Sequence, residues 1–338
     1  MGRREQREWV DLPDEALLDV RICDLGVSVR EGALAANLER LAGELERAGL
    51  RFRPYAWLST DWFTPDGIAG FGIPFFLAHP RLARLERKKM FEVEGGNRDW
   101  CMKLMRHETA HAIDNAYRIR RRKAWRERFG RASTPYRWSY VPDPNSPNFV
   151  INLDNWYAQS HPVEDFAETF AVWLRGGRWR QRYADQPVAL RKLRYVDALM
   201  QEIADVEPPV RTRECPDSIS TLRFTLREYY ERKHSLFSED ELAVYDRDLE
   251  RLFPVADGRK RASTILREHR KELRERVAHW TGQHAIVVDE VLKGMIVRAR
   301  ELRLRARRPD ADVLRDAAIL LTVHTMRHVR RRHREYFR

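Results

Sequence analysis

Residues 106–114 read RHETAHAID and contain one H-E-x-x-H motif. On a helix, residues four positions apart lie one above the other on the same face, so His107 and His111 can bind one metal ion between them. The carboxylate of Glu108, directly after the first histidine, can then reach a water molecule on that metal. The motif is short enough to occur by chance. It therefore predicts a zinc site only if the rest of the chain supplies a third ligand.

A carboxylate-rich segment further along the chain offers candidates for that ligand. Residues 162–174 have the spacing of a helix that begins at a proline, and Glu164 and Glu168 are four apart on one face of it. A catalytic zinc site takes three protein ligands and leaves one position for water. One glutamate can bind the metal while the other accepts the outer N–H of a ligand histidine. Solvated carboxylates at a helix N-terminus are the alternative, which the H-E-x-x-H motif makes the weaker one.

Together, residues 107–114 (HETAHAID) and 157–170 (YAQSHPVEDFAETF) resemble the bacterial zinc-binding metallopeptidases. They are also similar to the peptidase domain of anthrax lethal factor, another gluzincin. In those proteins a helix with E-x-x-x-E follows the H-E-x-x-H helix, and a tyrosine precedes its first glutamate by seven residues. The resemblance implies a zincin-like fold and one zinc ion. The implied zinc ligands are His107, His111 and Glu164.

The resemblance implies roles for three more side chains. Glu108 would be the general base, Glu168 the carboxylate behind a ligand histidine, and Tyr157 the hydroxyl that stabilises the oxyanion. The implied activity is zinc-dependent hydrolysis of peptide bonds. Because Pro74 cannot donate to a strand ladder, we expect residues 72–77 to form an edge strand along which the substrate backbone lies.

The pattern of apolar residues predicts an α+β fold. Strands are expected at residues 16–24, 51–58, 72–77 and 149–153, and helices at residues 33–49, 100–129 and 162–174. After the pair Pro208-Pro209, the pattern predicts helices only. We therefore expect two domains. A zincin-like domain with a small mixed sheet and an active-site helix occupies residues 1–207, and an all-helical extension occupies residues 208–338.

Composition restricts the partners and the location. The net charge of +12 comes mostly from arginines interleaved with acidic residues, which favours a solvated, ion-paired surface over a nucleic-acid interface. A basic surface would suit an acidic peptide or protein substrate. The chain shows neither a signal-peptide pattern nor an apolar run of about 18 residues, so we expect no membrane partner. The three scattered cysteines form no disulfide framework and favour the cytoplasm.

Two alternatives from other classes stay open. The Arg-rich residues 118–131, with Trp125 and Phe129 among them, and the tail 327–338 would suit a basic, nucleic-acid-associated protein in which the zincin-like site is secondary. Trp125 and Phe129 are four apart, so they equally fit one packing stripe of a helix. The other alternative is a catalytically silent zincin-like binding protein. The presence of Glu108 argues against it, because metal binding alone does not require that residue.

Overall fold

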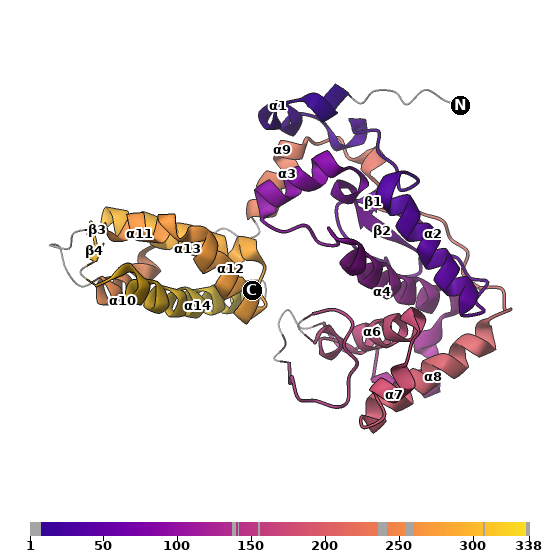
Figure 1. The fold of residues 1–338 in the computed structure, drawn as a ribbon. Helices are drawn as coiled ribbons and strands as arrows, with labels where there is room; N and C mark the ends of the chain where they lie inside the picture. Colours follow the sequence, from indigo (N-terminus) through magenta and orange to yellow (C-terminus); the bar gives the residue numbers. More distant parts are fainter. Residues whose placement is uncertain are drawn as a thin grey trace. The chain divides into compact units, whose positions relative to one another are not determined.

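The computed structural model describes residues 8–136, 140, 142–154, 156–235, 242–253, 260–306 and 308–335. Over these residues the chain is mostly helical and carries two small sheets, which is compatible with an α+β fold (Figure 1). Within the same ranges, no helix is both long and apolar enough to cross a bilayer.

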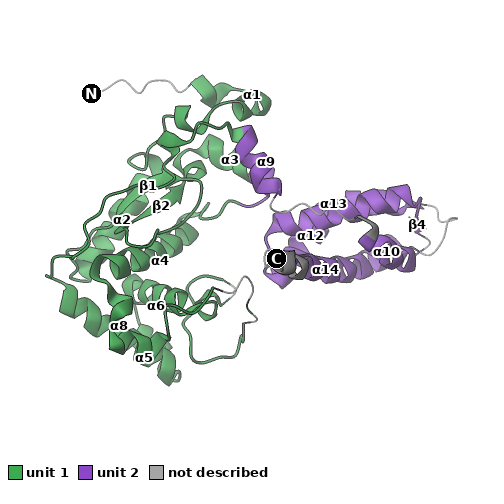
Figure 2. Cartoon of the chain, turned by 180° about the vertical axis from the view of Figure 1, so that it is seen from behind, with its two compact units in different colours: residues 1–86, 93–226 green, residues 87–92, 227–338 purple. Residues whose placement is uncertain are grey.

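The chain divides into two compact units, shown in different colours in Figure 2. Unit 1 comprises residues 1–86 and 93–226, and unit 2 comprises residues 87–92 and 227–338. The helices of unit 1 are α1 (Asp14–Leu18), α2 (Gly32–Arg47), most of α3 (Pro80–Met90), α4 (Arg98–Tyr117), α5 (Lys123–Phe129), α6 (Pro162–Arg175), α7 (Trp179–Arg182) and α8 (Pro187–Ile203). Its strands are β1 (Tyr55–Ser59) and β2 (Gly70–Pro74).

From the sequence we expected the boundary between the units at residue 207. In the structure it lies at residue 226. The segment 208–226 belongs to unit 1 because its backbone accepts hydrogen bonds from side chains of β1. The indole N–H of Trp57 donates to the carbonyl of Pro216, and the hydroxyl of Ser59 donates to that of Asp217, both at 2.9 Å. The Pro208-Pro209 pair therefore lies inside unit 1.

The sheet of unit 1 is smaller than expected and has a different edge. Strands β1 and β2 are parallel, with Tyr55 opposite Gly70 and Ser59 opposite Pro74. On the other side of β2, the N–H of Gly72 donates to the carbonyl of Phe63 at 2.8 Å. A Cβ atom at Gly72 would lie 2.6 Å from the Phe63 ring, so only glycine allows this approach. The expected strand at residues 72–77 is thus confirmed only at residues 72–74, since Phe75–Ala78 form a 3₁₀ turn, and its expected free edge is wrong at Gly72, where Phe63 covers it.

Two other expected strands are absent. Residues 16–24 lie in the end of α1 and in a 3₁₀ turn at Ile22–Asp24. The acidic residues Asp14 and Glu15 occupy the first turn of α1, where they stabilise a helix N-terminus. Residues 149–153 form no strand and pass α6 as an irregular segment.

The helix α4 carries the H-E-x-x-H motif and is buried over most of its length. It begins at Asn97, whose side chain accepts from the N–H of Trp100 at 2.9 Å. It ends at Arg118, whose backbone is left-handed (φ 54°) and stops the helix that we expected to continue to residue 129. Arg106 forms two hydrogen bonds to Glu44 of α2, at 2.7 and 2.9 Å, and so connects the two helices.

The helix α6 carries the two glutamates and lies beside α4 (Figure 1), and it also packs against α5. Pro162 is its first residue, as expected, and His161 precedes it as the N-cap. Phe166 and Phe170 are fully buried, and the ring of Phe166 contacts those of Trp125 and Phe129. The aromatic stripe of α6 therefore faces the core, and Glu164 and Glu168 face α4.

Unit 2 is built mainly of helices, as expected. They are α9 (Leu226–Ser235), α10 (Asp246–Leu252), α11 (Ala262–Glu268), α12 (Arg270–Thr281), α13 (Ala285–Glu301) and α14 (Asp310–Glu335). The two-residue strands β3 (Lys260–Arg261) and β4 (Arg305–Ala306) pair antiparallel. Its core contains Phe253, Leu292 and Met295, which are completely buried. The buried carboxylate of Asp289 pairs with Arg270 and Arg274.

The Arg106–Glu44 pair gives a test of the packing of α2 on α4. Both side chains are under 8% exposed. Replacing Arg106 leaves the Glu44 carboxylate buried with only the more exposed Arg40 as partner. We expect Arg106→Met to lower the free energy of unfolding by about 3 kcal/mol. Urea unfolding followed by circular dichroism measures the change.

Two controls distinguish the buried pair from ordinary surface charges. The double variant Arg106→Met/Glu44→Leu should recover most of the loss, because no charge is then left buried. Arg51→Met removes an ion pair to Asp205 in which both side chains are 77% exposed, and should change stability by less than about 1 kcal/mol. Equal losses in Arg106→Met and Arg51→Met would contradict the assignment.

Candidate metal centre

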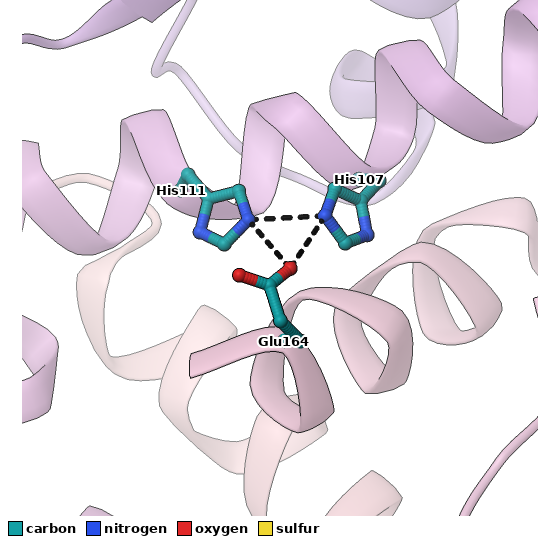
Figure 3. Close-up of side chains that lie close together, drawn as sticks. All are labelled: His107, His111 and Glu164. Carbon is teal, nitrogen blue, oxygen red and sulfur yellow. Dashed lines mark hydrogen bonds and ion pairs between the residues drawn. The ribbon is translucent and has the colours of Figure 1, made fainter. Parts of the chain in front are cut away.

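His107 and His111 project from one face of α4, one turn apart (Figure 3). Their Nε2 atoms lie 3.0 Å apart. Glu164 approaches from α6, and its Oε2 atom lies 3.0 Å from His107 Nε2 and 3.3 Å from His111 Nε2. All three side chains are at most 12% exposed. The structure thus brings together the three residues that the sequence predicts as zinc ligands.

The size of this triangle fits a zinc ion. Zinc binds histidine nitrogen and carboxylate oxygen at roughly 2.0–2.2 Å, and tetrahedral geometry then separates two ligand atoms by about 3.3 Å. The separations of 3.0, 3.0 and 3.3 Å between the three ligand atoms are close to that value. One imidazole nitrogen from each histidine and one carboxylate oxygen are also the donor set that zinc prefers. The residues present therefore fit the metal.

Glu168 lies on the opposite side of the His107 ring. Its Oε1 atom is 2.9 Å from His107 Nδ1. The same oxygen accepts from the side-chain amide of Asn152 at 2.9 Å, and Oε2 accepts from the N–H of Leu153 at 2.7 Å. With Nδ1–H donating to Glu168, His107 would offer the lone pair of Nε2 to a metal ion at the centre. The contact is compatible with the role that the resemblance implies for Glu168.

The electrostatics of the centre favour a cation. Burial disfavours the imidazolium of His107, but the carboxylates of Glu164 and Glu168 outweigh burial and hold the His107 pKa well above its usual value. Burial also acts against the charge of Glu164, yet His111 and His107 keep the Glu164 pKa well below its usual value. Positive charge between the two helices therefore stabilises the buried carboxylates, and a proton or a metal ion can provide it.

Glu108 is 6% exposed, and Thr64 fixes its side chain by a hydrogen bond. The Thr64 hydroxyl donates to Glu108 Oε2 at 2.8 Å and lies 3.2 Å from the Glu108 carbonyl. Asn115 holds the next part of this segment, since its side-chain amide donates to the carbonyls of Pro65 and Ile68 at 2.8 and 2.9 Å. The carboxylate of Glu108 therefore has a defined position beside the histidines.

Tyr157 lies at the same centre, in a 3₁₀ turn before α6. Its ring centroid is 5.6 Å from that of His107. Among the described residues, none forms a hydrogen bond with its hydroxyl. Burial, followed by the charge of Glu164, raises the pKa of Tyr157, so the hydroxyl keeps its proton and can donate it.

One residue of the centre was not predicted from the sequence. The hydroxyl of Tyr136 donates to Glu164 Oε1 at 2.7 Å. The Tyr136 ring stacks on the His161 ring, with centroids 3.7 Å apart and planes 13° apart. Tyr136 lies in an irregular segment 28 residues before Glu164. Neither periodicity nor motif spacing points to such a residue, so the sequence holds no signal that could have identified it.

A small cavity lies at the start of α4. Its volume is about 240 Å³, and it is lined by Asn97, Asp99, Trp100, Lys103, Leu153 and Asp154. Lys103 is one turn before His107 and so shares its face of the helix. Leu153 contributes its N–H to Glu168. The lining contains none of the three proposed zinc ligands and carries charges of both signs.

The Arg-rich residues 118–131 do not form a surface for stacking nucleic-acid bases. Trp125 is completely buried and Phe129 is 7% exposed, and both pack on α6. Arg120 pairs with Asp114 and Asp66, and Arg122 pairs with Glu202. The packing interpretation of the aromatic pair is thus correct. In the tail, the residues 336–338 and the side chains from residue 330 onward lie outside the described part of the chain.

A second group of potential ligands occurs in unit 2, formed by Glu268, His269 and Asp310. The ammonium group of Lys260 lies 2.7 Å from Glu268 Oε2 and 2.7 Å from Asp310 Oδ2. This cation already pairs with both carboxylates at the position between them. The group is therefore an ion-pair cluster and not a metal centre.

Comparison of the chain with models of protein families, with curated proteins and with solved structures finds no match. The functional interpretation therefore rests on the geometry of the centre and on the two sequence motifs.

The metal centre gives a graded prediction for zinc binding. His107→Ala and Glu164→Ala each remove a ligand and should abolish stoichiometric zinc binding. Glu168→Ala removes only the support of His107 and should weaken zinc binding by roughly 10–100-fold. Metal analysis and competition with a chromophoric chelator measure both effects. As a control, Glu202→Ala changes an exposed carboxylate and should bind zinc normally. If Glu164→Ala bound zinc more tightly than Glu168→Ala, Glu168 would be the ligand and Glu164 the support.

Proposed function

We propose that the protein is a zinc-dependent metallopeptidase of the gluzincin kind, with a zincin-like catalytic domain in unit 1. The observation that carries the proposal is the triangle of His107, His111 and Glu164, with Glu108 on the same helix as the two histidines. The resemblance of the two motifs to bacterial zinc-binding metallopeptidases supports it. We further propose a cytoplasmic location, since all three cysteines are free thiols.

The chemistry divides between the metal and the side chains around it. Zinc bound by His107, His111 and Glu164 would polarise a water molecule and lower its pKa towards neutrality. Glu108 takes a proton from that water as its oxygen bonds to the carbonyl carbon of the substrate. Glu108 then gives the proton to the amide nitrogen, and the C–N bond breaks to release a carboxylic acid and an amine.

Tyr157 supports this reaction as a hydrogen-bond donor. Its hydroxyl is protonated, lies next to His107 and forms no hydrogen bond with another described residue. It can therefore donate to the carbonyl oxygen as negative charge develops there. A donor that is already in place needs no reorganisation during the reaction.

The substrate class follows from the chemistry of the centre and not from a strand edge. The edge of β2 is covered at Gly72 by Phe63, so we do not propose that the substrate pairs there. We propose a peptide or protein substrate. The net charge of +12 favours an acidic substrate.

Glu108→Gln tests the proposed function. The amide keeps the shape of the side chain but cannot accept the proton, so zinc binding should stay stoichiometric while peptide hydrolysis falls by at least about 10²-fold. Metal analysis and cleavage of a quenched fluorescent peptide library measure the two properties. Glu202→Gln serves as the matched control and should retain both. Undiminished hydrolysis by Glu108→Gln would refute the mechanism.

The same measurements separate the alternatives. Stoichiometric zinc in the unaltered protein together with no hydrolysis of any library peptide would favour the catalytically silent binding protein. Nucleic-acid binding that falls steeply with salt would favour the nucleic-acid-associated protein.

Thr64→Val tests whether the position of Glu108 matters. Valine has the size of threonine but cannot donate to the Glu108 carboxylate. A hydrogen bond to a charged group contributes enough for its loss to lower kcat about tenfold. Zinc affinity should not change, because Thr64 touches no ligand. Steady-state kinetics at saturating zinc measure the effect, and a kcat equal to that of the unaltered protein would show that Thr64 is not needed.

A further inference from the structure

Two tyrosines lie at the metal centre, and their hydroxyl groups have different surroundings. The Tyr136 hydroxyl donates to Glu164 Oε1 at 2.7 Å. The Tyr157 hydroxyl forms no hydrogen bond with the other described residues. One hydroxyl is thus committed to a ligand carboxylate, and the other is available to a bound molecule.

The hydrogen bond from Tyr136 distinguishes the two oxygens of Glu164. Oε2 faces both histidine nitrogens, while Oε1 is occupied by Tyr136. A carboxylate held in this way would offer mainly Oε2 to a zinc ion, and a catalytic zinc site with three protein ligands keeps a position for water.

Tyr136 lies in an irregular segment, and the stacking of its ring on His161 keeps its hydroxyl at Glu164 Oε1. His161 is 4% exposed, and both of its ring nitrogens have partners. Nδ1 accepts from the N–H of Val163 at 3.2 Å, so Nε2 carries the proton and donates to the carbonyl of Thr134 at 2.7 Å. His161 is therefore a fixed ring that connects the segment around Thr134 to the first turn of α6.

We propose that Tyr136 is a positioning residue of the metal centre and that His161 is its support. This inference rests on the proposed metal site, but it does not require that the protein hydrolyses peptides. Tyr136 acts through Glu164 by fixing the outer oxygen of that ligand. Tyr157 acts on the substrate. Loss of the Tyr136 hydroxyl should therefore change zinc affinity, whereas loss of the Tyr157 hydroxyl should change kcat.

Tyr136→Phe and Tyr157→Phe test this division. Each removes one hydroxyl and keeps the ring. Tyr136→Phe should weaken zinc binding by about tenfold, since supports of metal ligands typically contribute 10–100-fold, and saturating zinc should restore kcat to within about threefold. Tyr157→Phe should bind zinc normally and lose about 10²-fold in kcat, which zinc does not restore. Tyr195→Phe removes the hydroxyl of another partly buried tyrosine of unit 1, beside Arg128, and serves as the control.

The outcomes separate the inference from the proposed function. Zinc competition with a chelator reports on Tyr136 even if the unaltered protein cleaves no peptide. Zinc affinity within twofold of the unaltered protein in Tyr136→Phe would overturn the inference. If kcat of Tyr136→Phe fell as far as that of Tyr157→Phe, and saturating zinc did not restore it, Tyr136 would be a catalytic residue instead.

His161→Asn tests the support. Asparagine can still accept from the N–H of Val163 as an N-cap but provides no ring for Tyr136 to stack on. We expect zinc binding to weaken to about the same extent as in Tyr136→Phe. The double variant His161→Asn/Tyr136→Phe should be no weaker than Tyr136→Phe alone, because both changes act through one hydrogen bond. Additive losses would show that His161 acts independently of Tyr136.

Discussion

The contact between His107 Nδ1 and Glu168 Oε1, at 2.9 Å, connects the two helices on which the whole centre depends. The helix α4 contributes both histidines and Glu108, and α6 contributes Glu164 and Glu168. A shift of one helix along the other by a single turn, about 5.4 Å, would separate all of these groups. The buried contact makes such a shift costly, because it would leave a carboxylate without a partner in the core.

Charged groups outside the metal centre fix the position of α6 and take no part in the proposed reaction. The ammonium group of Lys192, on α8, lies 2.6 Å from Asp165 Oδ2 and 2.8 Å from the carbonyl of Asn148. Asn148 begins the segment that carries Asn152 and Leu153 to Glu168. One buried cation therefore connects α8, α6 and this segment. The neighbours Glu164 and Asp165 thus have different functions, because a helix turns by about 100° from one residue to the next.

Sequence predicts the parts of the centre that depend on helical spacing, and misses those that depend on irregular backbone. His107 and His111, like Glu164 and Glu168, are four apart, and that spacing alone places each pair on one face. Tyr136 and Thr64 reach the centre from segments without periodicity, so only the folded chain brings them there. The same reason explains the misplaced domain boundary, since the segment 208–226 joins unit 1 through carbonyl groups that any sequence would have.

The segment 63–68 has two consequences that together restrict how a substrate can bind. Phe63 pairs with Gly72 and closes the edge of β2 to strand addition. The next residue, Thr64, holds the carboxylate of Glu108, and Asn115 holds the carbonyls that follow. Displacing Phe63 to open the strand edge would therefore also disturb the proposed general base. A substrate that binds with Phe63 still paired to Gly72 involves no such conflict.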